Sequence, residues 1–330
     1  MYYIVDHSTD PQWNLAAEEY LFKKFKQPVF RLWRNEPSII IGLHQNAFAE
    51  INIDYVKKNK IPIIRRLSGG GAVFHDLGNV NFTFIDNKIP GENTSDMFGR
   101  FTRPIIEALK SLGIDASLKG RNDLVIEDKK FSGNAVAVFK ERILQHGTLL
   151  YSASMANLSE ALANRPEHFK GKSVKSNRTR VTNISDHLSN NMSVEEFTTY
   201  LEKFITENLS NKYKKYSYST VDLAAIAKLT MEKYSKESWN YGSSPKYGYS
   251  KTERFDWGIL ELYMEVKKGV IEEIRFFGSY FFIKESSLLE KELRGCSNTV
   301  KAIKEVVQKI DLSDYFSNIT EEEFLSMFPQ

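Results

Sequence analysis

The segment from Arg65 to Asn79 constrains this chain more than any other. It contains three consecutive glycines at 69–71, preceded by two arginines and followed by the pair His75-Asp76. Glycines allow a backbone to bend sharply and let a ligand approach it closely. Bare amides beside fixed positive charge suit a phosphate or carboxylate anion. An ordinary tight turn with solvated arginines would also explain the glycines, and only the flanking charges favour the anion site.

Length and charge describe a globular protein of about two domains. The 330 residues include 45 basic and 42 acidic side chains, a formal net charge of +3, so we expect no nucleic-acid binding from charge alone. Cys296 is the only cysteine, which excludes an intramolecular disulfide and favours a reducing, cytoplasmic setting. We expect no signal peptide, because the N-terminus has no positively charged stretch followed by an apolar core. We expect no membrane span, because no apolar run approaches about 20 residues.

Hydrophobic patterning predicts helices and strands without strict β-α-β alternation. The predicted helices cover residues 11–26, 52–59, 95–112, 194–208 and 221–235. The predicted strands cover 29–33, 38–42, 61–66, 79–84 and 143–151, with a hairpin of 121–126 and 129–135 that turns at Glu127-Asp128. This mixture favours an α+β fold with a largely antiparallel or mixed sheet.

A change in composition after residue 240 predicts a linker and a second, smaller α+β unit. We expect a domain of residues 1–244, followed by an accessory domain of residues 245–330. The second unit should contain a hairpin of 258–266 and 270–277 and helices that begin near 297 and 320. It carries no glycine loop or His/Cys cluster, which favours docking or closure over chemistry.

Two further patterns leave alternatives open. Asn79, Asn81 and Thr83 alternate with apolar residues, so they share a strand face that either lines a pocket or is open to water. Residues 168–185 contain no acid but five basic side chains. That segment is either a cationic loop ordered by a bound anion or a solvated basic loop.

The chain lacks several familiar catalytic patterns. We find no metal-ligand cluster, glycosidase-like carboxylate pair, nucleophile elbow or phosphate-loop lysine motif. What remains is an anion site without a covalent nucleophile. Such a site can position and stabilise a phosphoryl or acyl-phosphate centre.

Taken together, the motifs resemble those of lipoate–protein ligases. The resemblance rests on residues 65–79, on Asn122-Asp123-Leu124 and on residues 129–135; segments 14–20, 146–150 and 178–184 also match, in the family's order. It covers nearly the whole chain, and the C-terminal unit resembles the accessory domain of the long bacterial form. The family usually has glycine where this chain has Asp128, a residue type that tolerates a positive φ.

The resemblance implies a catalytic domain of the biotin/lipoate ligase type and a reaction in two steps. ATP and lipoate would give lipoyl-AMP and pyrophosphate with Mg²⁺, and a lysine of an apo lipoyl domain would then accept the lipoyl group as an amide. The implied acceptors are acyltransferase subunits of 2-oxoacid dehydrogenase complexes, the glycine-cleavage H-protein, or both. A monomer is expected.

The resemblance also assigns residues. Lys130 matches the catalytic lysine, and Asp123 would either orient it or hold Mg²⁺. His75 would shape the pocket or serve as a structural histidine. The residues matching ATP- and lipoyl-AMP-binding positions are Arg66, Ser68, Gly70, Gly71, Ala72, Val73, Phe74, His75, Asn79, Asp123, Lys130, Ala135, Arg178 and Arg180.

Two other functions compete with the ligase. An ATP-independent lipoyl or octanoyl transferase can use a cysteine nucleophile, but residues 1–295 contain no cysteine, and Cys296 is predicted to be an inert thiol. A lysine-dependent transferase stays open. A non-catalytic lipoyl-adenylate binder is the other alternative, and the intact motif around Lys130 counts against it.

Overall fold

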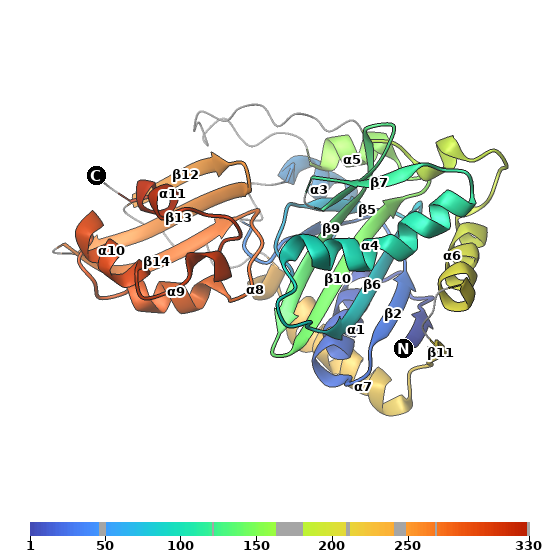
Figure 1. Cartoon of the computed structure of the whole chain (residues 1–330), viewed down its shortest axis with the longest axis horizontal. Helices are drawn as coiled ribbons and strands as arrows, with labels where there is room; N and C mark the ends of the chain where they lie inside the picture. Colours follow the sequence, from blue (N-terminus) through green and yellow to red (C-terminus); the bar gives the residue numbers. More distant parts are fainter. Residues whose placement is uncertain are drawn as a thin grey trace.

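A mixed sheet forms the main body of the protein (Figure 1). The computed structural model describes residues 1–45, 51–120, 122–162, 181–208, 212–240, 249–267 and 269–328. Within these ranges the strand order is β11 (Lys214–Lys215), β1 (Tyr2–Val5), β2 (Val29–Trp33), β6 (Asn79–Asn87), β10 (Arg142–Leu150), β9 (Lys129–Phe139), β8 (Asp123–Ile126) and β7 (Ala116–Lys119). β1 runs parallel to β2 and β11, and the other neighbours are antiparallel, which confirms the predicted mixed sheet.

Each face of this sheet has its own cover. Helices α4 (Thr94–Ser111) and α6 (Val194–Asn208) pack on the face that carries Phe82 and Phe84. The other face meets α1 (Pro11–Lys24), α7 (Thr220–Leu229) and a small sheet in the order β4 (Ile63–Arg65), β3 (Ser38–Ile41), β5 (Val73–His75). Short helices complete this part of the chain: α3 (Ile53–Asn59), α5 (Met155–Ala161), α8 (Glu237–Asn240), a 3₁₀ turn Ile184–His187 and a π-helical turn Thr230–Tyr234.

Local sequence signals explain several of these boundaries. The Asp10 side chain accepts a hydrogen bond from the Gln12 amide, so it caps α1 as predicted. Glu127 and Asp128 both adopt positive φ, 49° and 62°, the conformation that a tight hairpin requires at both central residues. The aspartate therefore fits where the related motif usually has glycine. The predicted helix of residues 221–235 ends earlier as an α-helix, at Leu229, and continues as the π-helical turn.

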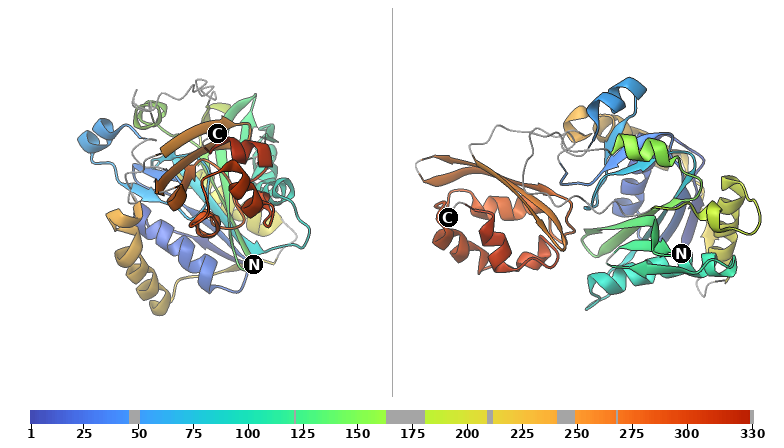
Figure 2. Two further views of the ribbon diagram at one scale, coloured as in Figure 1. Left: turned by 90° about the vertical axis from the view of Figure 1, so that its left-hand side faces the viewer. Right: turned by 90° about the horizontal axis from the view of Figure 1, so that it is seen from above.

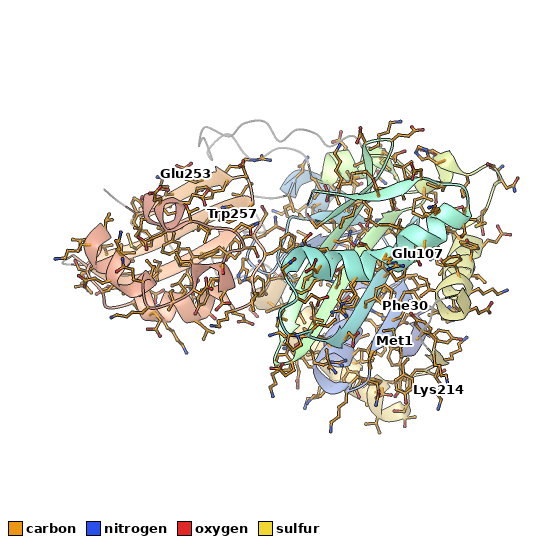
Figure 3. All side chains as sticks on the ribbon, in the orientation of Figure 1. Met1, Phe30, Glu107, Lys214, Glu253 and Trp257 are labelled. Atoms are coloured by element: carbon orange, nitrogen blue, oxygen red, sulfur yellow. The ribbon has the colours of Figure 1, made fainter. Side chains whose placement is uncertain are left out.

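The C-terminal unit has a separate core. Strands β12 (Tyr249–Phe255), β13 (Gly258–Lys267) and β14 (Val270–Gly278) form an antiparallel sheet. Helices α9 (Ser286–Leu293), α10 (Val300–Val307) and α11 (Glu321–Ser326) and a 3₁₀ turn Leu312–Asp314 pack against it. Figure 3 labels Trp257 in this core and Phe30 in the core of the main body. The hairpin predicted for this unit is confirmed. Strand β12 and helix α9 were not predicted. The predicted domain boundary at residues 244 and 245 lies outside the described residues.

The C-terminal unit lies beside the main body (Figure 2), and backbone hydrogen bonds join it to the glycine loop and to His44. The Gly70 amide donates to the Tyr280 carbonyl at 3.2 Å, and the Gly278 amide donates to the His44 carbonyl at 2.7 Å. The His44 ring stacks on Tyr280 with centroids 4.9 Å apart. Burial, with the nearby Arg65, lowers the pKa of His44 to about 3, so this imidazole is neutral. The Phe281 side chain packs into the core of the main body, where its ring centroid lies 5.6 Å from that of Phe98.

The close approach at Gly69 gives a test of this contact. A Cβ atom at Gly69 would lie 2.0 Å from the Tyr280 carbonyl oxygen, whereas one at Gly71 would meet nothing within 4 Å. We expect Gly69→Ala to lower the free energy of unfolding by about 1–3 kcal/mol, because backbone must move. Gly71→Ala is the matched control and should change it by less than about 0.5 kcal/mol. Denaturant unfolding of both variants measures this, and equal stabilities would contradict the described contact.

No helix in the described ranges combines the length and the hydropathy that crossing a bilayer requires.

Candidate active site

A row of residues from five strands crosses the main sheet beside the glycine loop. The register pairs Trp33 with Asn81, Asn81 with Thr148, Thr148 with Gly133, and Gly133 with Asp123. Directly paired residues point to the same face, and neighbouring strands lie about 4.8 Å apart, so the row spans about 19 Å. An indole stands at one end of it and a carboxylate at the other.

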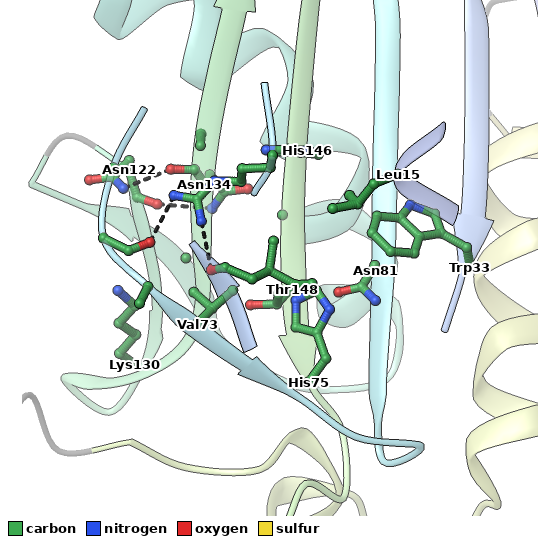
Figure 4. Close-up of a pocket in the computed structure, with 18 residues that line it drawn as sticks. Leu15, Trp33, Val73, His75, Asn81, Asn122, Lys130, Asn134, His146 and Thr148 are labelled. Carbon is green, nitrogen blue, oxygen red and sulfur yellow. Dashed lines mark hydrogen bonds between the residues drawn. The ribbon is translucent and has the colours of Figure 1, made fainter. Parts of the chain in front are cut away.

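A cavity of about 120 Å³, partly open to solvent, lies over this row (Figure 4). Helix α1, strand β3 and the glycine loop contribute the opposite wall. The lining residues are Leu15, Trp33, Ile40, Arg66, Gly70, Gly71, Ala72, Val73, His75, Asn81, Asn122, Lys130, Gly133, Asn134, Ala135, His146, Gly147 and Thr148.

The structure brings most of the predicted site residues to this cavity. Those that line it are Arg66, Gly70, Gly71, Ala72, Val73, His75, Lys130 and Ala135. Ser68, Phe74 and Asn79 are buried and do not line the cavity. The Asn79 side-chain amide donates to the Phe74 carbonyl at 3.0 Å and holds the turn behind the loop. Arg178 and Arg180 lie outside the described residues.

Lys130 occupies the end of the cavity nearest the carboxylate. Its Nζ lies 2.7 Å from Asp123 Oδ1, and both side chains are about 30% exposed, 29% and 30%. The same Nζ lies 3.2 Å from the position that a Cβ at Gly133 would occupy, so the ammonium group sits over that glycine. The Lys130 carbonyl accepts from the Thr182 amide at 3.0 Å. Thr182, near the end of the basic segment of residues 168–185, therefore lies beside Lys130.

Arg66 holds the glycine loop from inside. Its guanidinium donates to the carbonyls of Ile40, Gly69 and Gly71 at 3.0, 2.6 and 2.8 Å and to Ser68 Oγ at 3.0 Å. Burial lowers its pKa to about 10, so the group stays charged at neutral pH. A buried cation bonded to loop carbonyls keeps the loop in one conformation.

Arg65 has a corresponding role at the root of the loop. It donates to the carbonyls of Gly42 and Leu43 on one side and to those of Trp239 and Asn240 on the other. These bonds join the end of β3 to α8, the last described helix before the C-terminal unit.

A buried hydrogen-bond network starts at cavity-lining residues and extends to the next row of the sheet and to helix α1. His146 Nδ1 lies 2.9 Å from Glu18 Oε2, and His146 Nε2 lies 2.6 Å from Ser68 Oγ. The Thr83 hydroxyl donates to Glu18 at 2.7 Å and accepts from the Trp33 indole at 3.0 Å. Since Ser68 also accepts from Arg66, the network runs without a break from the indole to the glycine loop; we refer to it as the Glu18 network.

Burial tends to raise the pKa of Glu18, but the charge and hydrogen bond of His146, with the Thr83 bond and Arg31, hold it below its usual value. Glu18 is therefore a carboxylate in the folded protein. The sequence alone places Glu18 only within a helix motif and Trp33 only within a strand. Both could have been found only from strand register, because their partners are distant in sequence.

The side chains near the cavity show what kind of site could hold the Mg²⁺ that the motif resemblance implies. Among the described residues, no group of three or more His, Cys, Asp or Glu side chains could hold a metal ion. Mg²⁺ with a nucleotide commonly uses only one or two carboxylates and completes its shell with phosphate oxygens and water. Asp123 does not line the cavity itself, but it is paired with Lys130, which does, and it fits that smaller requirement.

The chain matches known proteins over most of its length. The family model described as the lipoyl protein ligase A/B catalytic domain matches residues 10–206, and the one for the bacterial lipoate protein ligase C-terminus matches residues 244–328. The chain is 42% identical over 322 residues to lipoate-protein ligase LplJ of Bacillus subtilis, covering 96% of each chain.

Solved structures show the same likeness. The crystal structure of P. falciparum LipL1 in complex with lipoate superposes with a TM-score of 0.76 at 27% identity, covering 98% of this chain and 97% of that one. A lipoate-protein ligase A bound with ATP gives a TM-score of 0.61 at 30% identity, covering 73% and 96%. The family models span most of the sequence and the relative matches nearly end to end, so the chain belongs to the lipoate–protein ligase family.

Proposed function

We propose that this protein activates lipoate with ATP, giving lipoyl-AMP and pyrophosphate, and then transfers the lipoyl group to a lysine of apo lipoyl domains. The observation that carries the proposal is the pairing of Lys130 and Asp123 at one end of a cavity whose other end is walled by Leu15, Trp33 and Ile40. A fatty acyl tail suits the apolar end, and a carboxylate or phosphate suits the ammonium group.

Within this proposal Lys130 bridges the lipoyl carbonyl and the α-phosphate, with three donors on a compact charge. The glycine-loop amides face the adenylate, and Arg66 fixes that loop through the carbonyl bonds described above. Asp123 would hold Mg²⁺, which lowers the negative charge of the phosphates when bound. Arg178 and Arg180, which shortly precede Thr182 in the sequence, would add positive charge.

The proposed acceptors are acyltransferase subunits of 2-oxoacid dehydrogenase complexes and the glycine-cleavage H-protein. The lysine of the acceptor domain attacks the mixed anhydride and AMP leaves, so an amide forms as the acyl-phosphate bond breaks. We propose a monomer for the working form. We propose the cytoplasm as its compartment, because the reaction consumes ATP.

The test combines the purified chain with ATP, Mg²⁺, free lipoate and an apo lipoyl domain. We expect pyrophosphate release, and the acceptor should gain the mass of one lipoyl group. A parallel sample without ATP, given an octanoyl-carrier donor instead, tests the transferase. Modification only in that second sample would overturn the ligase proposal, as would the absence of both lipoyl-AMP and pyrophosphate in the first.

A further inference from the structure

We propose that His75 and Asn81 bind the sulfur end of the acyl substrate and so make this protein prefer a dithiolane-bearing acid to a saturated acid of similar length. The inference rests on the proposed function for the identity of the ligand. It adds the residues that would set acyl preference.

Both side chains present unpaired polar atoms at the cavity. His75 Nε2 and both polar atoms of Asn81 are buried and have no hydrogen-bond partner within the described residues. The residues are 3% and 1% exposed and line the cavity wall, and Figure 4 shows them on the same side as Trp33. Buried polar groups without partners are costly in free energy. Because these atoms face a cavity, we infer that a bound ligand supplies their hydrogen-bond partner.

A chain of hydrogen bonds determines which proton His75 offers. Arg31 can only donate, and its Nη2 lies 2.6 Å from Asn14 Oδ1, which fixes the orientation of that amide. Asn14 Nδ2 then donates to Asn35 Oδ1 at 2.9 Å. Asn35 Nδ2 in turn faces His75 Nδ1 at 3.1 Å and must donate to it. His75 therefore accepts at Nδ1 and carries its proton on Nε2.

The imidazole is neutral as well as oriented. Burial lowers the pKa of His75 to about 3, and the charges of Arg66 and His146 act in the same direction. His75 thus offers the cavity one fixed, uncharged N–H donor. Asn81, which pairs with Trp33 in the row across the main sheet, adds the hydrogens of its side-chain amide.

The position of these donors matches the length of the substrate. Lys130 Nζ lies over Gly133, and Asn81 stands two strands away along the row through Thr148. Two strand spacings are about 10 Å, and an extended chain from the carboxyl carbon of lipoate to its ring sulfurs also covers roughly 8–10 Å with ordinary bond lengths. With the carboxyl group at Lys130, the sulfurs reach His75 and Asn81.

Divalent sulfur accepts hydrogen bonds weakly, and a terminal methyl group accepts none. A saturated acid would therefore offer no acceptor to the His75 and Asn81 donors. Sites that present buried donors reject analogues that lack the acceptor. The Trp33 ring, whose centroid lies 6.0 Å from that of His75 in an edge-to-face arrangement, adds apolar surface at this end.

The experiment measures preference rather than absolute rate. Lipoate and octanoate compete in one adenylation reaction for the wild type, Asn81→Leu and His75→Phe, and the two adenylates are quantified by mass spectrometry. We expect the lipoate-to-octanoate ratio of kcat/KM to fall about tenfold in each variant, since sulfur is a weak acceptor. The ratio does not depend on how much of a preparation is folded.

Asn87→Leu is the matched control, because Asn87 lies on the same strand at its exposed end. It should keep the wild-type ratio. Calorimetric titration with each free acid provides a second readout that needs no catalysis. An unchanged preference in both cavity variants would overturn the inference while leaving the ligase proposal intact. A wild type that forms no adenylate, yet binds lipoate preferentially and loses that preference in the variants, would overturn the proposed function alone.

Discussion

Replacing Lys130 with alanine is expected to reduce the rate of lipoyl-AMP formation about a thousandfold, the effect of removing a preorganised donor from a developing charge. Arg66 also lines the cavity, but its donors bond to loop carbonyls and Ser68. Within the described residues the Lys130 ammonium is paired with Asp123 at a part-exposed position, so it can turn toward a ligand. Pyrophosphate release with ATP and lipoate measures the effect.

The variant should remain folded, because a part-exposed ion pair contributes about 0–1 kcal/mol. Lys129→Ala is the matched control: that side chain is 41% exposed and its Nζ lies 3.6 Å from Glu127, away from the cavity. Circular dichroism and thermal unfolding of both variants would confirm equal folding. Near-normal pyrophosphate release by Lys130→Ala would remove this residue from the proposed catalytic role.

Glu18→Gln is expected to lower both stability and activity. It removes the carboxylate that His146 and Thr83 contact and that helps Arg66 keep its charge. Breaking a buried ionic network costs about 3 kcal/mol or more. A misplaced glycine loop should also reduce kcat/KM about a hundredfold, since small displacements near reacting groups have effects of that size. Denaturant unfolding and steady-state adenylation kinetics measure the two effects.

The neighbouring Glu19 provides the comparison. It is also buried, but it contacts Lys233 and Tyr234 instead of the cavity network. Glu19→Gln should cost similar stability yet leave kcat/KM of the folded protein within about twofold. Equal losses of activity in the two variants would contradict a specific role for the Glu18 network.

The stability difference at Glu18 should depend on pH. The pKa of Glu18 is lowered in the folded protein despite burial, through His146, Thr83 and Arg31. A carboxyl group with a lowered folded-state pKa stabilises the fold fully above its ordinary value of 4.5 and loses that contribution as pH falls through the folded-state pKa. The advantage of wild type over Glu18→Gln should therefore shrink in acid.

Local patterns predicted most elements of the main sheet and the charged end of the site. The hairpin around Glu127 and Asp128 and the cap at Asp10 depend on residues within a few positions, and the structure confirms both. Sequence motifs predicted that Lys130 and the glycine loop belong to the site. The residues at the opposite, apolar end of the cavity could not be predicted from local patterns, because Trp33 and Asn81 become neighbours only through strand register.

The arginines illustrate a second limit. Charge beside glycines predicts an anion ligand, but the number of backbone carbonyls that surround a guanidinium depends on the tertiary fold. Arg65 and Arg66 are both buried among such carbonyls. The face of Asn79, Asn81 and Thr83 is likewise buried, which excludes the open, solvated face that the sequence allowed.

The row that crosses the main sheet has a consequence for how such a pocket can diversify. A ligand lying across strands meets one residue from each, so its successive groups are encoded at widely separated places in the sequence. Trp33, Asn81, Thr148 and Gly133 belong to four different strands. A substitution on an outer strand can alter one end of the ligand while the far end keeps its own contacts. Substrate range and chemistry can therefore change independently, one strand at a time.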